Sequence, residues 1–490
     1  LTTFAQSVIL SGTISGKNFT IQDANFRKKI NLKGSETQIV QFQIQIKNPK
    51  LWWLNGIGEQ NLYLLKLQAN IGDNLSDRTE TQFGIREIRI VENENIQEFI
   101  NTMKDQAGNV YHLGKAVGAY PWTFVINGKK IFCKGANFGM LDLFYPRATE
   151  EKYRKALKMA KDANYNMFRL NGVGIPIEYD IFYDLCDEMG IMIWQDFPYS
   201  CAKYPQDEEF LKTAEEEARY IIRHLRNHPS LILWCGNNEC EAFEQHNKIF
   251  HELLPKICSE LDPTRPYWPS SPFSGEYPYE YNSPEKGDHH SWWPGYEYYQ
   301  KDESKFVSEF GFQAPPCIET LYSFVTDQHE LWPISSPKSV WEYRYYRPDM
   351  TWIYLDREYG LIGGWWAKSL EDYVRMAQLV QADNHKTAIE HFRRRKFKCG
   401  GTLFWSYVDP WPSITWSAVD YYLIPKISYY FGKRAYNPVL LSFSKEGEEI
   451  SVWVTSDKFE ELMVDVEVKH MCFDGSVLWE KKIPVKIPSN

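Results

Sequence analysis

Eight short candidate strands, most of them apolar, alternate with amphipathic helical patterns between residues 131 and 405, and this alternation limits the possible folds more than any other feature. Short apolar runs bounded by turn-forming residues are typical of buried strands. The predicted strands are Ile131–Lys134, Asn166–Leu170, Ile191–Trp194, Leu231–Trp234, Tyr267–Ser271, Asp288–Ser291, Phe306–Ser308 and Thr402–Trp405. Because strands that alternate with helices form parallel sheets, the pattern predicts a (β/α)8 TIM barrel, with a doubly wound open sheet as the alternative.

The helices between these strands carry recognisable ends. A helix over Glu150–Ala163 follows Thr149, a suitable N-cap residue, and one over Ile177–Glu188 stops before Gly190, a suitable C-cap. Two more helices are predicted over Glu208–Arg226 and Glu371–Phe397. No GxGxxG or GxxxxGK[ST] motif follows any predicted strand, so the usual reason to expect nucleotide binding is absent.

Both ends of the chain alternate apolar and polar residues with a period of two, which predicts β-strands. These strands are Val40–Ile46, Leu62–Leu67 and Ile85–Ile90 near the start, and Val439–Phe443, Ile450–Val454, Leu462–Val468 and Val477–Lys482 near the end. We therefore expect a multidomain protein, in which the central barrel is flanked by immunoglobulin-like β-sandwich domains. The expected domains are 1–92 (sandwich), 93–432 (barrel) and 433–490 (the start of a second, incomplete sandwich).

Charge and cysteine spacing exclude several classes of protein. The net charge is −9 without a sustained basic block, which argues against nucleic acid or an anionic membrane as partner. No apolar stretch approaches the ~20 residues that a membrane-spanning helix needs. The nine cysteines are scattered singly, so we expect free and mostly buried thiols. No cysteine pair has zinc-site spacing, and we expect no metal.

Chemically useful side chains stand at the ends of most predicted strands, and in a barrel the carboxyl ends of the strands meet at one face. The candidate site residues are Arg169, Asn171, Asp196, Asn238, Glu239, His290, Trp292, Glu309 and Trp405. The two glutamates are the most informative. Glycoside hydrolysis requires one carboxyl group that protonates the leaving oxygen and a second that attacks the sugar or activates water.

Three of these candidates have alternative interpretations. His290 and its neighbour His289 could be metal ligands, but no His or Cys stands at ligand spacing, so a hydrogen bond in the pocket is the favoured role. Asp196 could bind a substrate hydroxyl or hold neighbouring side chains in place. Trp292 could line the pocket or belong to the core.

Five segments of the chain resemble glycoside hydrolase family 2, most of all its β-mannosidase branch. They read INGKKIFCKGANF, MIWQDFPYSC, LILWCGNNE, KFVSEFGFQ and DPWPSITWSAVDYY. The resemblance covers nearly the whole chain. It implies a retaining exo-β-glycosidase, a β-mannosidase by its branch, that cleaves terminal β-linked mannose from oligosaccharides without a cofactor.

The resemblance also implies roles for individual residues. Glu239 matches the acid/base and Glu309 the nucleophile of a double displacement. Asn238 matches the residue that binds the sugar 2-hydroxyl, Arg169 the arginine that supports the nucleophile, and Trp405 the aromatic platform under the sugar.

The chain departs from the family pattern at positions that bear on the substrate. Asn171 and Phe138 stand where the mannosidases usually have tryptophan. The related exo-β-D-glucosaminidases typically carry Asp at the acid/base position, so Glu239 disfavours that alternative. A non-catalytic carbohydrate-binding protein is the remaining alternative, and the presence of both glutamates argues against it. We also expect an N-terminal jelly-roll domain to precede this chain in the whole protein.

Overall fold

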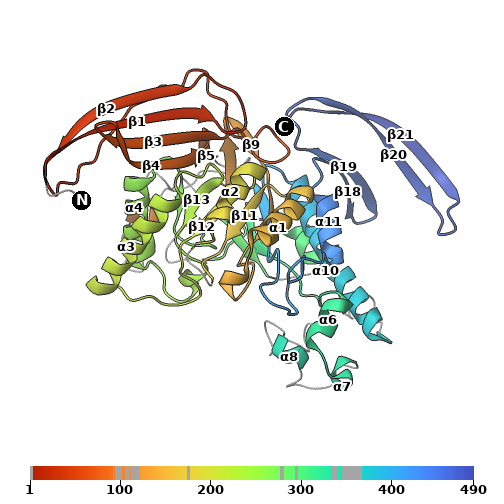
Figure 1. The fold of residues 1–490 in the computed structure, drawn as a ribbon. Coiled ribbons are helices and arrows are strands. Elements are labelled where there is room, and N and C mark those ends of the chain that lie inside the picture. Colours follow the sequence, from red (N-terminus) through yellow and green to blue (C-terminus); the bar gives the residue numbers. More distant parts are fainter. Residues whose placement is uncertain are drawn as a thin grey trace. The chain divides into compact units, whose positions relative to one another are not determined.

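The computed structural model describes residues 4–91, 93, 102–104, 110–112, 122–173, 177–275, 281–292, 296–332, 340–344 and 367–490 (Figure 1). The chain forms two compact units, each interrupted along the sequence. Unit 1 comprises residues 1–89, 126–128 and 170–270, and unit 2 comprises residues 90–125, 129–169 and 271–490.

Unit 1 begins with a four-stranded antiparallel sheet in the order β2-β1-β3-β4, coloured red to orange in Figure 1. Its strands are β1 (Gln6–Gly16), β2 (Ala24–Leu32), β3 (Tyr63–Ile71) and β4 (Asn74–Phe83). Gly12 in β1 faces the Phe26 ring of β2, where a Cβ would lie only 2.1 Å from the ring. A glycine at this position therefore leaves room for the phenylalanine.

The predicted strand at Val40–Ile46 is wrong, because these residues are assigned to no strand. The alternation that suggested it is nevertheless present in the burial: Phe42, Ile44 and Ile46 are half-buried and the glutamines between them are exposed. Phe42 packs against Phe26 with ring centroids 4.7 Å apart. An extended segment needs this pattern to place apolar side chains on one face, whether or not its backbone pairs with a neighbour.

The rest of unit 1 contains three parallel strands, β12 (Met192–Asp196), β13 (Leu231–Cys235) and β14 (Tyr267–Trp268), paired in chain order. The helices of this part are α2 (Asp180–Met189), α3 (Glu208–Leu225), η2 (Cys240–Ala242), η3 (Ile249–Leu253) and α4 (Leu254–Leu261). The predicted end of α2 at Gly190 is confirmed, with this glycine in the left-handed conformation. Asp207, which was not predicted as a cap, is the N-cap of α3.

Unit 2 contains five parallel strands in the order β11-β10-β17-β16-β15. They are β10 (Cys133–Asn137), β11 (Met167–Leu170), β15 (His289–Ser291), β16 (Val307–Phe310) and β17 (Gly401–Phe404). The first and last of the eight predicted strands therefore pair with each other, with Cys133 opposite Gly401 and Ala136 opposite Phe404. Pairing of the first strand with the last closes a barrel and is not the order of a doubly wound sheet.

Helix α1 (Glu150–Asp162) begins at Thr149, whose side chain accepts a hydrogen bond from the Lys152 amide, as predicted. The long helix α10 (Leu370–Arg394) has Ser369 as its N-cap. The shorter helices are η1 (Tyr145–Arg147), α5 (Tyr296–Lys301), α6 (Ile318–Phe324), α7 (Gln328–Leu331), α8 (Val340–Arg344) and α11 (Ile427–Ala435). Within the described ranges, no helix is long and apolar enough to cross a membrane.

The remaining strands are short or belong to hairpins. A turn at Asn127 and Gly128, both with positive φ, joins β8 (Thr123–Ile126) to β9 (Lys129–Ile131). The C-terminal hairpins are β18–β19 (Val439–Glu446, Glu449–Ser456) and β20–β21 (Leu462–Met471, Val477–Ile487), drawn in blue in Figure 1. The others are β5 (Ile88–Val91), β6 (Thr102–Lys104) and β7 (Val110–His112). The domain boundaries after residues 92 and 432 stay predictions.

Candidate active site

The side chains proposed to act on a substrate lie in or just beyond the last residues of parallel strands. Arg169 in β11, His290 in β15 and Glu309 in β16 are strand residues, and every residue of these three strands is buried. These strands are shielded from solvent although they carry polar and charged side chains. A charged residue in such a strand needs a partner, because an unpaired buried charge is costly.

Glu309 has that partner in unit 2. The Arg169 guanidinium donates from Nη1 to Glu309 Oε1 over 2.7 Å, and the side chain of Glu309 is 5% exposed and that of Arg169 is fully buried. The same Nη1 donates to Asn137 Oδ1 over 3.2 Å. Because arginine stays protonated in proteins, this contact favours the ionised form of the Glu309 carboxylate. An ionised, buried carboxylate is the form that acts as a nucleophile.

His290 lies against the other oxygen of the same carboxylate. Its Nδ1 is 3.5 Å from Glu309 Oε2, and its Nε2 is 3.1 Å from the Ser271 hydroxyl. Ser271 in turn donates to Asp288, which also accepts a hydrogen bond from Ser308, the residue before Glu309. This buried network fixes both the histidine ring and the strand that carries Glu309.

The ring of the neighbouring His289 has a different hydrogen-bond partner. The ring of His289 contacts the Ser304 hydroxyl at 2.7 Å through Nδ1. Burial lowers the pKa of His289 to about 4, so the ring is neutral at neutral pH. Of the two histidines considered for a metal or pocket role, only His290 therefore lies beside Glu309.

The aromatic candidates of unit 2 follow β17 and β15. Trp405 comes directly after β17, and its amide donates to the Phe310 carbonyl. A Cβ at Gly311 would lie 2.4 Å from the Trp405 carbonyl oxygen, so only glycine permits this close approach beside Glu309. Trp292 packs edge-on against Trp416 with centroids 6.0 Å apart, which places it against a buried cluster of unit 2.

The second candidate carboxylate lies in unit 1, after β13. Asn238 is buried and Glu239 is partly exposed. Glu239 has a left-handed backbone conformation with φ +57°, and its Oε2 accepts a hydrogen bond from Cys201 Sγ at 3.5 Å. Asn238 Nδ2 donates to the Ser200 hydroxyl over 3.3 Å. Asn238 and Glu239 are thus held by the loop that follows β12.

Asp196 and Asn171 are also buried in unit 1. Asp196, the last residue of β12, accepts a hydrogen bond from the Gly172 amide over 3.3 Å, which fits a role in holding neighbouring groups. Asn171 is 4% exposed, and neither its Oδ1 nor its Nδ2 has a hydrogen-bond partner among the described residues. Buried side-chain amides without partners are rare, because each unmade hydrogen bond costs free energy.

Several residues of this site were not singled out from the sequence. Ser271, Ser200 and Cys201 each contact a candidate residue, and Asp288 accepts a hydrogen bond from Ser271. Ser200 and Cys201 end the segment MIWQDFPYSC, and Asp288 begins the sixth predicted strand, so proximity to strand ends was the available signal. Nothing in their spacing indicates which side chain each one contacts.

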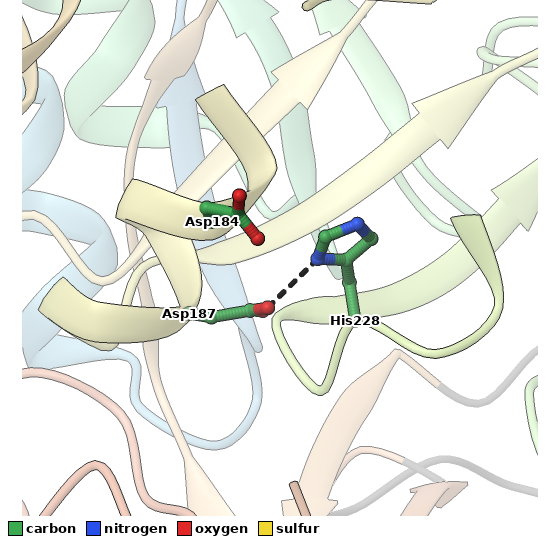
Figure 2. A group of neighbouring side chains, drawn as sticks. All are labelled: Asp184, Asp187 and His228. Carbon is green, nitrogen blue, oxygen red and sulfur yellow. Dashed lines mark hydrogen bonds and ion pairs between the residues drawn. The ribbon is translucent and has the colours of Figure 1, made fainter. Parts of the chain in front are cut away.

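One other cluster has the composition of a metal site. Asp184, Asp187 and His228 in unit 1 have potential ligand atoms within 4.8 Å of one another (Figure 2). Both Asp187 oxygens already accept hydrogen bonds, Oδ2 from His228 Nδ1 at 2.7 Å and Oδ1 from the Ser230 amide at 3.0 Å. These contacts explain the cluster as part of the fold.

Comparison with protein families matches three parts of the chain. Residues 2–86 match the model of glycosyl hydrolases family 2, and residues 121–357 match the TIM barrel domain of that family. Residues 448–490 match the mannosidase Ig/CBM-like domain. Curated relatives include β-mannosidase B of Emericella nidulans, 29% identical over 88% of this chain, and that of Aspergillus niger, 30% identical over 84% of this chain. The chain spans about half the length of these relatives, 53% and 49% respectively.

Solved structures agree with the family models. The β-D-mannosidase from Dictyoglomus thermophilum is 35% identical and superposes with a TM-score of 0.82, covering 100% of this chain and 58% of its own. The exo-chitosanase from Amycolatopsis orientalis is 21% identical with a TM-score of 0.74, covering 99% of this chain and 55% of its own. The predicted fold class, a TIM barrel flanked by immunoglobulin-like domains, is confirmed.

Proposed function

The chain belongs to glycosyl hydrolases family 2, and from this premise we propose that it is a retaining exo-β-mannosidase that removes terminal β-linked mannose from oligosaccharides. The observation that carries the proposal is the buried ion pair between Arg169 and Glu309, 2.7 Å long, at the carboxyl end of a barrel strand. In TIM-barrel enzymes, catalytic residues stand at this end of the strands. The curated relatives named β-mannosidase B support mannose as the sugar.

Glu309 is the proposed nucleophile. Its carboxylate attacks the anomeric carbon and forms a covalent glycosyl ester, while the bond from that carbon to the leaving oxygen breaks. The Arg169 guanidinium supports this role because it keeps the carboxylate ionised and fixes Oε1. His290, 3.5 Å from Oε2, fixes the other oxygen.

Glu239 is the proposed acid/base. It gives its proton to the departing oxygen and then takes one from the water that releases the sugar, which restores both glutamates. Its partial exposure supports this role, because protons and water must reach it. A retaining mechanism requires a separation of about 5 to 5.5 Å between its two carboxyl groups. No cofactor enters either step.

The other candidates bind the sugar. Trp405 is the proposed platform under the ring, Asn238 binds the 2-hydroxyl, and Trp292 and Asp196 shape the pocket wall. Asn171 is a specificity residue by this proposal, because its buried amide has both a donor and an acceptor without partners among the described residues. A sugar hydroxyl would satisfy both.

Two alternatives remain distinguishable by experiment. An exo-β-D-glucosaminidase has the same fold, but the similarity of 21% to the exo-chitosanase carries no information on substrate. A non-catalytic carbohydrate-binding protein would bind sugars without hydrolysing them. An N-terminal jelly-roll domain is part of the proposal for the whole protein.

The deciding experiment is a panel of aryl β-glycosides with mannose, glucosamine, galactose and glucose. It is run on this chain and on a version extended at its N-terminus. We expect the mannoside to give the highest kcat/KM. A preference for the glucosaminide would show that glucosamine, and not mannose, is the sugar. Binding without turnover in both versions would contradict the proposal that the protein is an enzyme.

The roles of the glutamates predict two different kinetic signatures. Glu309→Gln should lower kcat by roughly 10⁴-fold on every substrate, because every substrate needs the nucleophile. Glu239→Gln should lower kcat/KM by roughly 10³-fold on mannosides with poor leaving groups, and far less on activated aryl mannosides that depart without protonation.

The matched control is Glu241→Gln. Glu241 is a second carboxylate of the same loop, but it is buried and pairs with His251 Nε2 at 2.6 Å. This variant should affect stability and not leaving-group dependence. Equal losses on both substrate types in Glu239→Gln would argue against the acid/base role.

A further inference from the structure

The loops after β12 and β13 are joined by backbone hydrogen bonds beyond the ends of the two strands. The Asn238 amide donates to the Tyr199 carbonyl over 2.9 Å, and the Cys201 amide donates to the Asn238 carbonyl over 2.8 Å. Ser200 and Asn238 thereby form an isolated parallel bridge. The backbone before Glu239 is consequently fixed by the segment that contains Ser200 and Cys201.

The side chains of these loops make a second set of contacts. Cys201 Sγ accepts from the Ser200 hydroxyl at 3.3 Å and from Asn238 Nδ2 at 3.5 Å. The thiol then donates to Glu239 Oε2 at 3.5 Å. One sulfur therefore links both proposed functional residues, as acceptor from the amide and as donor to the carboxylate.

Two residues of this group have strained backbones. Cys201 has φ +47° and Glu239 has φ +57°, and neither is glycine. A left-handed conformation at such residues is maintained only when the surrounding contacts determine it, and it is found most often at functional sites. Both residues therefore have a locally unfavourable backbone conformation, and in this conformation the thiol and the carboxylate are in contact.

A thiol suits a carboxyl group that must gain and lose a proton in each cycle. Partial burial, with a smaller contribution from Glu239, raises the pKa of the Cys201 thiol, so it remains a neutral donor at neutral pH. A thiol is a weak donor. It orients the carboxylate without holding it in the ionised form as strongly as a hydroxyl or a cation would.

We propose that Cys201, held by Ser200, is a positioning residue that orients the Glu239 carboxyl and keeps it able to act as a proton donor. The inference rests on the proposed acid/base role of Glu239. Two variants test the two parts of this proposal, the orientation of the carboxyl group and its ability to donate a proton. Cys201→Ala removes the hydrogen-bond donor, and Cys201→Ser replaces it with a stronger donor of similar shape.

The first test is the pH dependence of kcat/KM on an aryl β-mannoside with a poor leaving group. Because a stronger donor favours the ionised carboxylate, Cys201→Ser should move the alkaline limb to lower pH by roughly half a unit. Cys201→Ala should lower kcat/KM roughly tenfold on this substrate and less than about twofold on an activated one. Cys472→Ala, which changes the other exposed cysteine, is the control and should match wild type.

The second test is independent of turnover. The rate at which iodoacetamide alkylates Cys201, followed by mass spectrometry, should rise roughly threefold to tenfold in Glu239→Gln, because the neighbouring negative charge that disfavours the thiolate is gone. Cys472 in the same sample should react at an unchanged rate.

The outcomes separate the two proposals. An unshifted alkaline limb in Cys201→Ser, together with equal losses on both substrates in Cys201→Ala, would overturn the positioning role even if the enzyme is active. An unchanged alkylation rate in Glu239→Gln would overturn it whatever the activity. If wild type shows no turnover but the alkylation rate of Cys201 still rises in Glu239→Gln, the proposed function is rejected. The contact between Cys201 and Glu239 is then still supported.

Discussion

At the scale of single residues, the chemistry depends on how a buried carboxylate is kept charged. The side chain of Glu309 is buried, where an ionised group is stable only beside an opposite charge. Arg169 supplies that charge and also hydrogen-bonds Asn137, so its planar guanidinium links two strands. Both hydrogen bonds come from Nη1, whose two hydrogens are fixed in the guanidinium plane. The freely rotating ammonium of lysine does not hold its donors in this geometry.

We therefore expect Arg169→Lys to lower kcat/KM on an aryl β-mannoside by roughly 10- to 100-fold, because a misplaced nucleophile loses alignment. The protein should also lose about 1 to 3 kcal/mol of unfolding free energy. Steady-state kinetics and urea denaturation measure the two effects.

Arg265→Lys is the matched control. Arg265 is also buried and donates from Nη1 to Asp262 at 2.6 Å, but neither residue is a site candidate. This variant should cost stability without lowering the turnover of the folded protein. If both variants reduced kcat/KM by the same factor, Arg169 would have only a structural role.

At the scale of elements, a histidine joins the end of α2 to the turn before β13. Asp187 on α2 accepts from His228 Nδ1 and from the Ser230 amide, and Asp184, one turn earlier on α2, is part of the same cluster (Figure 2). Burial alone would lower the pKa of His228, but the charge of Asp187 outweighs it, and the net pKa is raised. The helix is thus attached to the strand by an interaction that depends on pH.

The sign of this dependence follows from the raised pKa. The stabilisation is fully present below the unfolded-state pKa of about 6.5, and it is lost as pH rises through the higher folded-state value. His228→Asn keeps a donor but cannot become charged. We expect it to destabilise the protein by about 1 to 3 kcal/mol near pH 5.5, and less near pH 9, in urea denaturation.

His224→Asn serves as the comparison. His224 also contacts an aspartate, with Nε2 2.6 Å from Asp180 Oδ1, but that aspartate side chain is 70% exposed. Exposed pairs contribute little, so this variant should change stability by less than about 1 kcal/mol at either pH. A pH-independent loss in His228→Asn would mean that packing, not charge, holds the junction.

At the scale of the molecule, Asp457 joins the barrel strands of unit 2 to the C-terminal hairpins. It lies between β19 and β20, and it contacts Lys134 of β10 at 2.9 Å and Arg393 of α10 at 3.0 Å. Lys396 is 3.6 Å away. Burial alone would raise the pKa of Asp457, but the three cations outweigh it and lower the pKa to about 2.

A lowered folded-state pKa makes this contribution largest above the unfolded-state pKa of about 3.8, and it disappears as pH falls toward 2. We expect Asp457→Asn to cost about 3 kcal/mol at pH 7, because it leaves three neighbouring cations without their anion. The cost should shrink near pH 2.5, as urea denaturation at both pH values would measure.

Asp465→Asn on β20 is the control, since its 3.0 Å pair with Lys482 is exposed. It should cost less than about 1 kcal/mol at both pH values. A loss in Asp457→Asn as small as this control would show that the hairpins are held to unit 2 by other contacts.

The sequence by itself determined the local elements and the positions of the candidate groups. Thr149 and Gly190 marked helix ends because capping depends only on neighbouring backbone groups. Short runs, most of them apolar, marked the eight strands within a few residues, and the carboxyl ends of the strands indicated where Glu239 and Glu309 would lie. These properties are local, so a local pattern is enough to predict them.

Only the tertiary structure decided which of these groups meet. Pairing of β10 with β17 distinguishes a barrel from an open sheet, and it joins residues far apart in the sequence. His290 and not His289 lies beside Glu309, although the two are adjacent and chemically identical. The alternation at Val40–Ile46 correctly indicated which side chains are more buried, but the strand predicted from it is wrong. Cys201 resembled the eight other scattered cysteines until the fold brought its thiol to Glu239, because such contacts depend on packing between elements and leave no pattern in the chain.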